Sequence, residues 1–156
     1  MNKEFFMKEA IKLSRNNIKE QNGGPFGAII VKNWEIIGNG YNHVVKNNDP
    51  TAHGEIMAIR DACQKLGTFD LSWTEIYTSC EPCPMCLWAI YRSRIEKIYY
   101  GNTEKDAAEI WFDDAFFYEE LEKDKHKRKI HMEQLLHTEA YEIFKQRTET
   151  NKDIHY

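Results

Sequence analysis

Several features that define other classes of protein are scarce or missing in this sequence of 156 residues. It has no apolar run near the roughly 20 residues that a membrane-spanning helix needs. Its first residues, "MNKEFFMKEA", are acidic where a secretory signal would be basic and then apolar. Basic residues are not in excess, because 21 Lys and Arg face 25 Asp and Glu for a net charge of -4. We therefore expect a cytoplasmic protein with no membrane partner, and a nucleic-acid partner is disfavoured.

Internal repeats, low-complexity tracts and interdomain linkers are also missing from the sequence. A chain of 156 residues with 42% hydrophobic and 13% aromatic residues is large enough for one domain with a sizeable core. The sequence therefore predicts a single domain over residues 1–156.

Cysteine is infrequent, and three of the four cysteines fall within the seven residues "CEPCPMC". Disulfides among these three would constrain almost no chain. Clustered thiols in a reducing compartment indicate metal or redox chemistry instead. The fourth, Cys63, lies on the apolar face of a predicted helix, where we expect it to be a small core residue.

The order of the predicted elements indicates an α/β protein. The first helix and the following hairpin around Asn33-Trp34 precede alternating helices and strands. The predicted helices are residues 3–21, a segment from about 52, 84–94, pieces of 104–123, and 138–149; the predicted strands are 26–32, 35–41, 74–79, 95–101 and, as a candidate fifth strand, 128–134. This order predicts one mixed sheet with helices on both faces.

Two of the clustered cysteines and a histidine form a candidate metal site. Cys83 and Cys86 lie at i and i+3, at the start of a predicted helix whose N-terminus lowers thiol pKa values. His53 lies at the start of the preceding helix. One imidazole and two thiolates are three ligands for Zn²⁺, and three protein ligands with a fourth position left for water are typical of a catalytic site.

Glu55, two residues after His53, has a chemical role beside such a metal. Residues two apart on a regular helix diverge by about 200°, so these two can serve one centre only at a helix start and in different roles. We expect His53 to bind the metal and Glu55 to take a proton from the metal's water.

Three alternatives to a catalytic zinc centre explain the motif less well. A redox dithiol is disfavoured by Pro84-Met85 between the cysteines and by the upstream His and Glu. An iron–sulfur run would need its next ligand at Ile90, which cannot bind. A zinc-stabilised binding module has no use for the acid at position 55.

The spacing His53-x-Glu55 followed by Pro82-Cys83-x-x-Cys86 is the H-x-E…P-C-x-x-C signature of zinc nucleobase deaminases. With "TAHGEIMAI" and "TSCEPCPMCLWAIYRSRIEKIYYG", the chain from about residue 4 to 122 resembles the cytidine and deoxycytidylate deaminase superfamily. The resemblance implies a cytidine deaminase-like fold, a three-layer α/β/α sandwich with a five-stranded mixed sheet, and zinc-dependent hydrolytic deamination.

Within the superfamily, "GGPFGAIIVKNWEIIGNGYNHVVKNNDPTAH" is similar to the purine-acting branch, and "DAAEIWFDDAFFYEEL" with the terminal Tyr156 looks most like the bacterial guanine deaminases. That likeness implies conversion of guanine to xanthine and ammonia. It implies that Asn42 and Asp114 contact the base, with Asp114 as a second proton carrier, and that Phe26 lines the pocket.

The same likeness implies an assembly. It predicts a homodimer in which residues 137–156, a helix and tail, are exchanged between subunits so that Tyr156 helps close the neighbouring active site. An aromatic face of Trp88, Tyr91 and residues 116–118 would supply apolar surface for a two-fold interface.

Three residues depart from the family pattern, namely Gly54 for Ala, Trp88 for Gly and Arg92 for Trp. They leave the zinc ligands and Glu55 untouched but make the identity of the base less secure. A tRNA adenosine deaminase and a free cytosine or other nucleobase deaminase therefore stay open. The negative net charge disfavours a tRNA adenosine deaminase, although the local run "KDKHKRK" is basic.

Overall fold

The computed structural model of the chain describes residues 2–150. These residues belong to two compact units, with the boundary between Asp114 and Ala115. None of the described helices has the length and apolar character that crossing a membrane requires.

The first unit is built on a four-stranded mixed sheet in the order β2-β1-β3-β4. Its strands are β1 (Gly27–Lys32), β2 (Glu35–Tyr41), β3 (Glu75–Cys80) and β4 (Lys97–Asn102). Strand β1 is antiparallel to both β2 and β3, whereas β3 and β4 are parallel. The mixed α/β sheet predicted from the sequence is confirmed.

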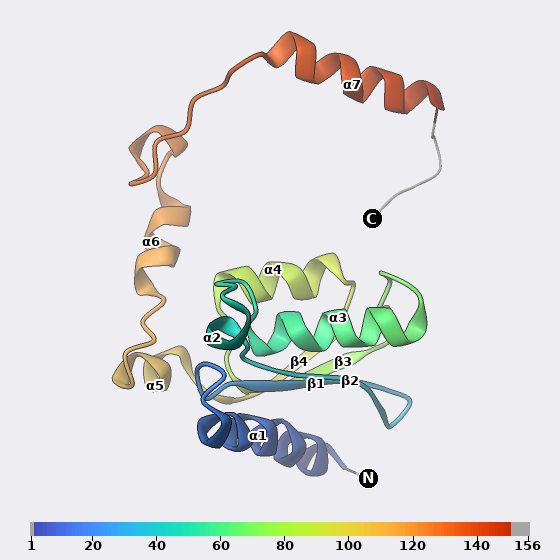
Figure 1. The fold of residues 1–156 in the computed structure, drawn as a ribbon, viewed down its shortest axis with the longest axis vertical. Coiled ribbons are helices and arrows are strands. Elements are labelled where there is room, and N and C mark those ends of the chain that lie inside the picture. Colours follow the sequence, from blue (N-terminus) through green and yellow to red (C-terminus); the bar gives the residue numbers. More distant parts are fainter. Residues whose placement is uncertain (1, 151–156) are drawn as a thin grey trace. The chain divides into compact units, whose positions relative to one another are not determined.

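Helices cover both faces of this sheet (Figure 1). Helix α1 (Lys3–Glu20) lies on one face, and α3 (Gly54–Leu66) and α4 (Pro84–Arg92) lie on the other. Two shorter helices, α2 (Val44–Asn47) and α5 (Glu104–Glu109), follow β2 and β4. Asn2 caps α1, because its side chain accepts from the amide of Phe5.

The turn between β1 and β2 is the hairpin that the sequence predicts. Asn33 and Trp34 have φ values of 49° and 67°, and a two-residue type I′ turn needs positive φ at both positions. Lys32 pairs with Glu35 on either side of the turn.

The prediction of a fifth strand at residues 128–134 is wrong, because in the part of the chain that the structure describes the sheet has four strands. This segment belongs to the second unit. Its first residues are bonded to Glu120 instead of to a strand: the amide of Lys129 donates to the Glu120 carboxylate and Arg128 Nε donates to the Glu120 carbonyl. Alternating polarity predicts a strand only where a partner edge is available.

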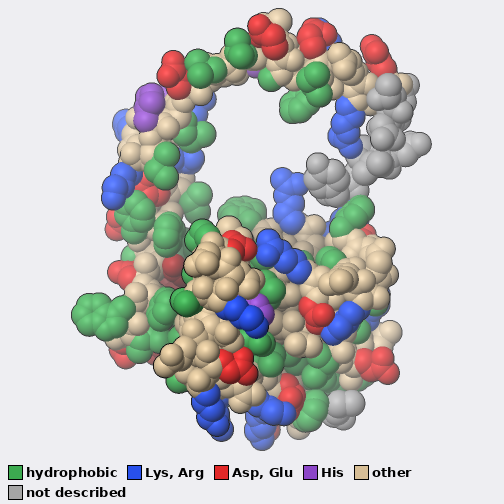
Figure 2. Space-filling model, viewed as in Figure 1, with side chains coloured by type: hydrophobic (Ala, Val, Ile, Leu, Met, Phe, Trp, Pro, Cys, Tyr) green, Lys and Arg blue, Asp and Glu red, His purple; other side chains and the backbone are tan. Residues whose placement is uncertain are grey.

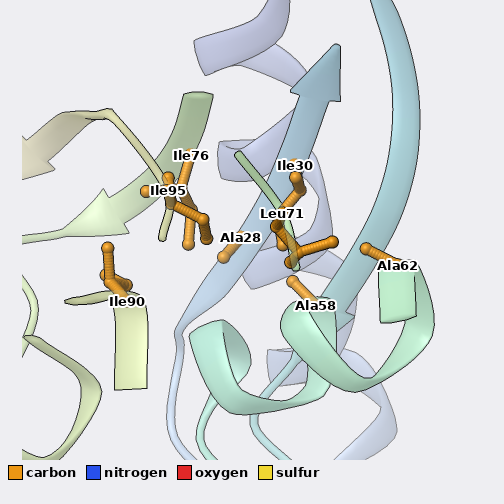
Figure 3. Packing of buried hydrophobic residues seen from close by; sticks show 8 residues of the cluster. All are labelled: Ala28, Ile30, Ala58, Ala62, Leu71, Ile76, Ile90 and Ile95. Atoms are coloured by element: carbon orange, nitrogen blue, oxygen red, sulfur yellow. The ribbon is translucent and has the colours of Figure 1, made fainter. Parts of the chain in front are cut away.

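The core of the first unit has two halves because residues along β1 alternate between the faces of the sheet. Ala28 and Ile30 point toward α3 and α4, where they pack with a cluster shown in Figure 3. Ile29 and Val31 point toward α1 and pack with Phe6, Ala10 and Tyr77.

Two glycines in β2 let α3 approach the sheet closely. A Cβ on Gly38 would lie 2.6 Å from the carbonyl oxygen of Ala58, and one on Gly40 would lie 2.3 Å from the amide nitrogen of Ala58. Both contacts are with helix backbone, which has no room to move aside. This close packing fixes the start of α3, where His53 is the N-cap residue and Glu55 lies in the first turn.

The second unit contains α6 (Ala115–Glu122), a 3₁₀ turn η1 (Lys125–Lys127) and α7 (His137–Thr150). Its apolar side chains are exposed among charged ones, as Figure 2 shows; examples are Ile130, Leu135 and Phe144. Phe116 and Phe117 are also exposed and contact each other edge to face. The prediction of one domain with an exchanged C-terminal segment stays a prediction.

Candidate active site

Two helix starts supply the candidate metal ligands. His53 is the N-cap residue of α3, and Cys83 is the N-cap residue of α4, with Pro84 directly after it. Both have an extended backbone, with ψ values of 159° and 166°. Neither side chain makes a capping hydrogen bond. The imidazole and the thiol are therefore turned away from their helices and toward each other.

The three predicted ligands converge at distances that fit zinc. The Sγ atoms of Cys83 and Cys86 each lie 3.5 Å from Nδ1 of His53, and the three ligand atoms lie within 4.8 Å of one another. Tetrahedral zinc with bonds of about 2.3 Å to sulfur and about 2.0 Å to nitrogen separates S and N by about 3.5 Å. The donor set and its spacing therefore suit Zn²⁺ with one coordination position left open.

The three side chains of this cluster shift one another's pKa values. The close contact with Cys86 lowers the pKa of Cys83, and the same contact together with burial raises the pKa of Cys86. The hydrogen bond between Cys83 and His53 raises the pKa of the imidazole. Thiolates are the form in which cysteine binds zinc, so a divalent cation here would favour loss of the thiol protons.

Glu55 lies in the first turn of α3 with only 5% of its surface exposed. Its Oε1 accepts a hydrogen bond from Thr78 Oγ1 on β3 at 3.0 Å. Burial raises the pKa of Glu55. A raised pKa makes a carboxylate a stronger base, which favours its use as an acid–base catalyst. Sequence reasoning did not identify Thr78, because only the strand register brings it to this carboxylate.

A mostly apolar cleft of about 650 Å³ opens beside His53. Phe26 forms one wall, and Phe112 packs against it edge to face with ring centroids 4.9 Å apart. The volume is within the range of small-molecule pockets. The sequence predicts no separate role for Phe112, although it stands two residues before Asp114 in the segment "DAAEIWFDDAFFYEEL".

Asn42 also lines this cleft and is 4% exposed. Its backbone amide donates to the carbonyl of Phe26 at 3.0 Å, and its Oδ1 accepts from the amide of Val44 at 3.1 Å. Because the amide oxygen is used within the protein, the NH₂ group is the part that can donate to a ligand.

Asp114 lies at the end of the first unit and is half-buried. Burial raises the pKa of this carboxyl group, and the negative charge of Cys83 raises it further. The imidazole of His53 acts in the opposite direction. The structure therefore brings Asp114 within electrostatic range of the metal cluster.

The three departures from the family pattern lie in different surroundings. A Cβ on Gly54 would lie 3.3 Å from the carbonyl oxygen of Phe26, a tight contact that glycine relieves. Trp88 is 60% exposed on α4 and contacts Tyr91 at a ring distance of 5.7 Å, and Arg92 is exposed on the same helix. Tyr156 lies outside the described residues.

The sequence matches a family model described as the cytidine and deoxycytidylate deaminase zinc-binding region over residues 1–102. The chain therefore belongs to this family of zinc-dependent deaminases. It is 48% identical to guanine deaminase of Bacillus subtilis over 144 residues, which cover 92% of each chain. It is 44% identical to a tRNA-specific adenosine deaminase of Aquifex aeolicus over 67% of this chain and 69% of that one.

A solved structure of the Bacillus subtilis guanine deaminase matches the fold with a TM-score of 0.96 and 45% identity. The match covers 100% of this chain and 99% of that one. Zinc is thus the cofactor that the family, the donor set and the geometry all indicate.

Proposed function

We propose that this protein is a zinc-dependent guanine deaminase that converts guanine and water to xanthine and ammonia. The observation that carries the proposal is the buried carboxylate of Glu55 beside the His53–Cys83–Cys86 cluster, in a chain that resembles guanine deaminase along almost its whole length. A closed structural zinc site would have four protein ligands and no need for such an acid.

Zinc held by His53, Cys83 and Cys86 would supply a Lewis acid that lowers the pKa of a water molecule. Glu55 accepts a proton from the attacking water and passes it to the ring nitrogen next to C2 of guanine. The water oxygen bonds to C2, and the second water proton is transferred to the exocyclic amino group. The bond between C2 and this amino group then breaks, ammonia leaves, and the C2–oxygen bond remains as the carbonyl of xanthine. Asp114, with its raised pKa, carries a second proton near the leaving amine.

The residues that line the cleft bind the base. The rings of Phe26 and Phe112 line it with apolar surface for a flat base and exclude water. The NH₂ group of Asn42 donates a hydrogen bond to a base acceptor. These roles of Phe26, Asn42 and Asp114 are part of the proposal.

We also propose the assembly and setting that the sequence predicts. The protein forms a homodimer in which residues 137–156 are exchanged and Tyr156 closes the neighbouring site, and the exposed pair Trp88–Tyr91 lies at the interface. It works in purine metabolism in the cytoplasm, where thiolate ligands stay reduced.

Initial rates of ammonia release test the substrate assignment. The panel consists of guanine, adenine, cytosine, their nucleosides and a tRNA anticodon stem-loop containing adenosine. Guanine should give the highest kcat/KM. If adenosine in RNA reacts fastest, the protein is a tRNA deaminase. If cytosine reacts fastest, the assignment to the purine-acting branch of the superfamily is wrong.

A further inference from the structure

Asn17 is an unusual residue for its position. It lies in the last turns of α1 and is 0% exposed. Asparagine is a poor helix former and is seldom fully buried. Its neighbour Asn16 is exposed on the same helix. Of these two adjacent asparagines, only Asn17 is buried.

The side chain of Asn17 joins two loops that are far apart in sequence. Its Nδ2 donates to the carbonyl of Gly24 at 2.7 Å and to the carbonyl of Asn42 at 2.9 Å. Both amide hydrogens are therefore used. In contrast, its Oδ1 is buried and has no hydrogen-bond partner within the described structure. The group thus acts as a double donor, and its buried oxygen is left unsatisfied.

The two loops joined in this way form the walls of the base pocket. Gly24 and Phe26 lie in one loop and Asn42 in the other, and all three line the cleft. The loops also contact each other through the Asn42 amide, which donates to the Phe26 carbonyl at 3.0 Å. A Cβ on Gly23 would lie only 2.0 Å from Oδ1 of Asn42, so the first loop packs directly on the carboxamide proposed to bind the base.

We propose that Asn17 is a positioning residue for substrate binding, which holds the Asn42 carboxamide and the Phe26 ring in the geometry that a purine base requires. It does not touch the substrate. This inference rests on the proposed function. The zinc ligands and Glu55 come from α3, α4 and their starts, whereas the side-chain hydrogen bonds of Asn17 go to Gly24 and Asn42. Loss of Asn17 should therefore affect KM more than kcat.

The test uses two variants of Asn17 and one matched control. Asn17→Leu keeps the branched shape of the side chain but removes both donors, whereas Asn17→Ser keeps one donor at most. Asn16→Ala removes the exposed neighbour of the same type. For guanine we expect KM to rise about tenfold in Asn17→Leu and about threefold in Asn17→Ser, with kcat changed by less than about threefold. Zinc content should stay at about one per chain, and Asn16→Ala should match the unaltered protein.

Several results would overturn the proposal. An unchanged KM in folded Asn17→Leu would mean that the two hydrogen bonds are not needed for binding. Equal losses of kcat and zinc content would mean that Asn17 supports only the fold. If Asn17→Leu does not fold, Asn17→Ser decides by the same criteria.

The unaltered protein separates this proposal from the proposed function. If it deaminates another base of the panel in place of guanine, the guanine assignment fails and the KM comparison is made on that base. If it deaminates no base, the proposed function and the role of Asn17 are both overturned.

Discussion

Among the individual residues, two of the candidate metal ligands occupy N-cap positions, where side chains usually stabilise helices. A Ser, Thr, Asp or Asn at an N-cap contributes about 1 kcal/mol through a hydrogen bond to the first turn. His53 and Cys83 occupy two such positions and make no capping bond. The chain forgoes this stabilisation at two helix starts, which is expected where the side chains serve a ligand instead.

Cys83→Ala tests the metal cluster. The variant removes one of three ligands, so zinc should be lost and the melting temperature should fall, because metal binding and folding are linked. Elemental analysis and thermal unfolding measure both effects.

Cys80→Ala is the matched control for that experiment. Cys80 is a buried cysteine of the same motif, but its Sγ donates to the carbonyl of Thr103 at 3.6 Å and is not bonded to His53. It should keep about one zinc per chain and lose only about 1 kcal/mol of stability. Full zinc in Cys83→Ala, or loss of zinc in Cys80→Ala, would mean that the ligand set is wrong.

The residues of the site differ in how far the sequence alone predicts them. His53, Cys83 and Cys86 follow from ligand chemistry and helix starts, and the structure brings them together. The roles of Thr78 and Phe112 depend on strand register and on how a loop returns to the cleft. The contacts of Thr78 and Phe112 are tertiary, so no local sequence pattern predicts them.

At the scale of elements, the position of the first turn of α3 depends on the strand beneath it. Gly40 lies under the backbone of Gly54, Met57 and Ala58. No side chain of Gly40 separates the helix backbone from the sheet. This contact therefore sets the positions of His53 and Glu55 at the start of the helix.

Gly40→Ala should move this turn. The added Cβ would lie 2.3 Å from the Ala58 nitrogen, and overpacking of this kind costs about 1–3 kcal/mol. We expect a lower melting temperature and a reduced zinc affinity, measured by thermal unfolding and competition with a chelator. Gly54→Ala is the milder control, because its Cβ comes no closer than 3.3 Å. Equal behaviour of the two variants would show that the β2 contact does not set the site.

The elements of the first unit were predicted well because each carries its own local signal. Helix α1 ends near the predicted residue, at a Gln21 with φ of 54°, and the strands of the hairpin match their predicted ranges closely. The fifth strand failed because strand formation needs a partner, and "RKIHMEQ" contains no information on where its neighbours lie.

At the scale of the whole molecule, the C-terminal unit has too little apolar burial to explain its helices by its own core. The side chains of α7 are exposed where they are described, and isolated helices of 14 residues are marginal in water. A second copy of the chain would supply the missing contacts, which is the reason for the proposed exchange.

Deletion of residues 151–156 tests the exchange. If Tyr156 closes the neighbouring site, the truncated protein should show a raised KM or a lowered kcat with unchanged zinc content. Sedimentation should report whether the dimer persists. If the truncated protein is monomeric and fully active, the tail does not close the neighbouring active site.

In the proposed reaction, the site adds water to C2 of guanine with Glu55 as the proton carrier. The most direct measurement is mass spectrometry of the product formed from guanine in heavy-oxygen water, with Glu55→Gln beside the unaltered protein. We predict xanthine carrying one heavy oxygen and an equal amount of ammonia, and a rate at least about 10²-fold lower for Glu55→Gln at the same zinc content. Absence of labelled xanthine, or a normal rate in Glu55→Gln, would contradict the account.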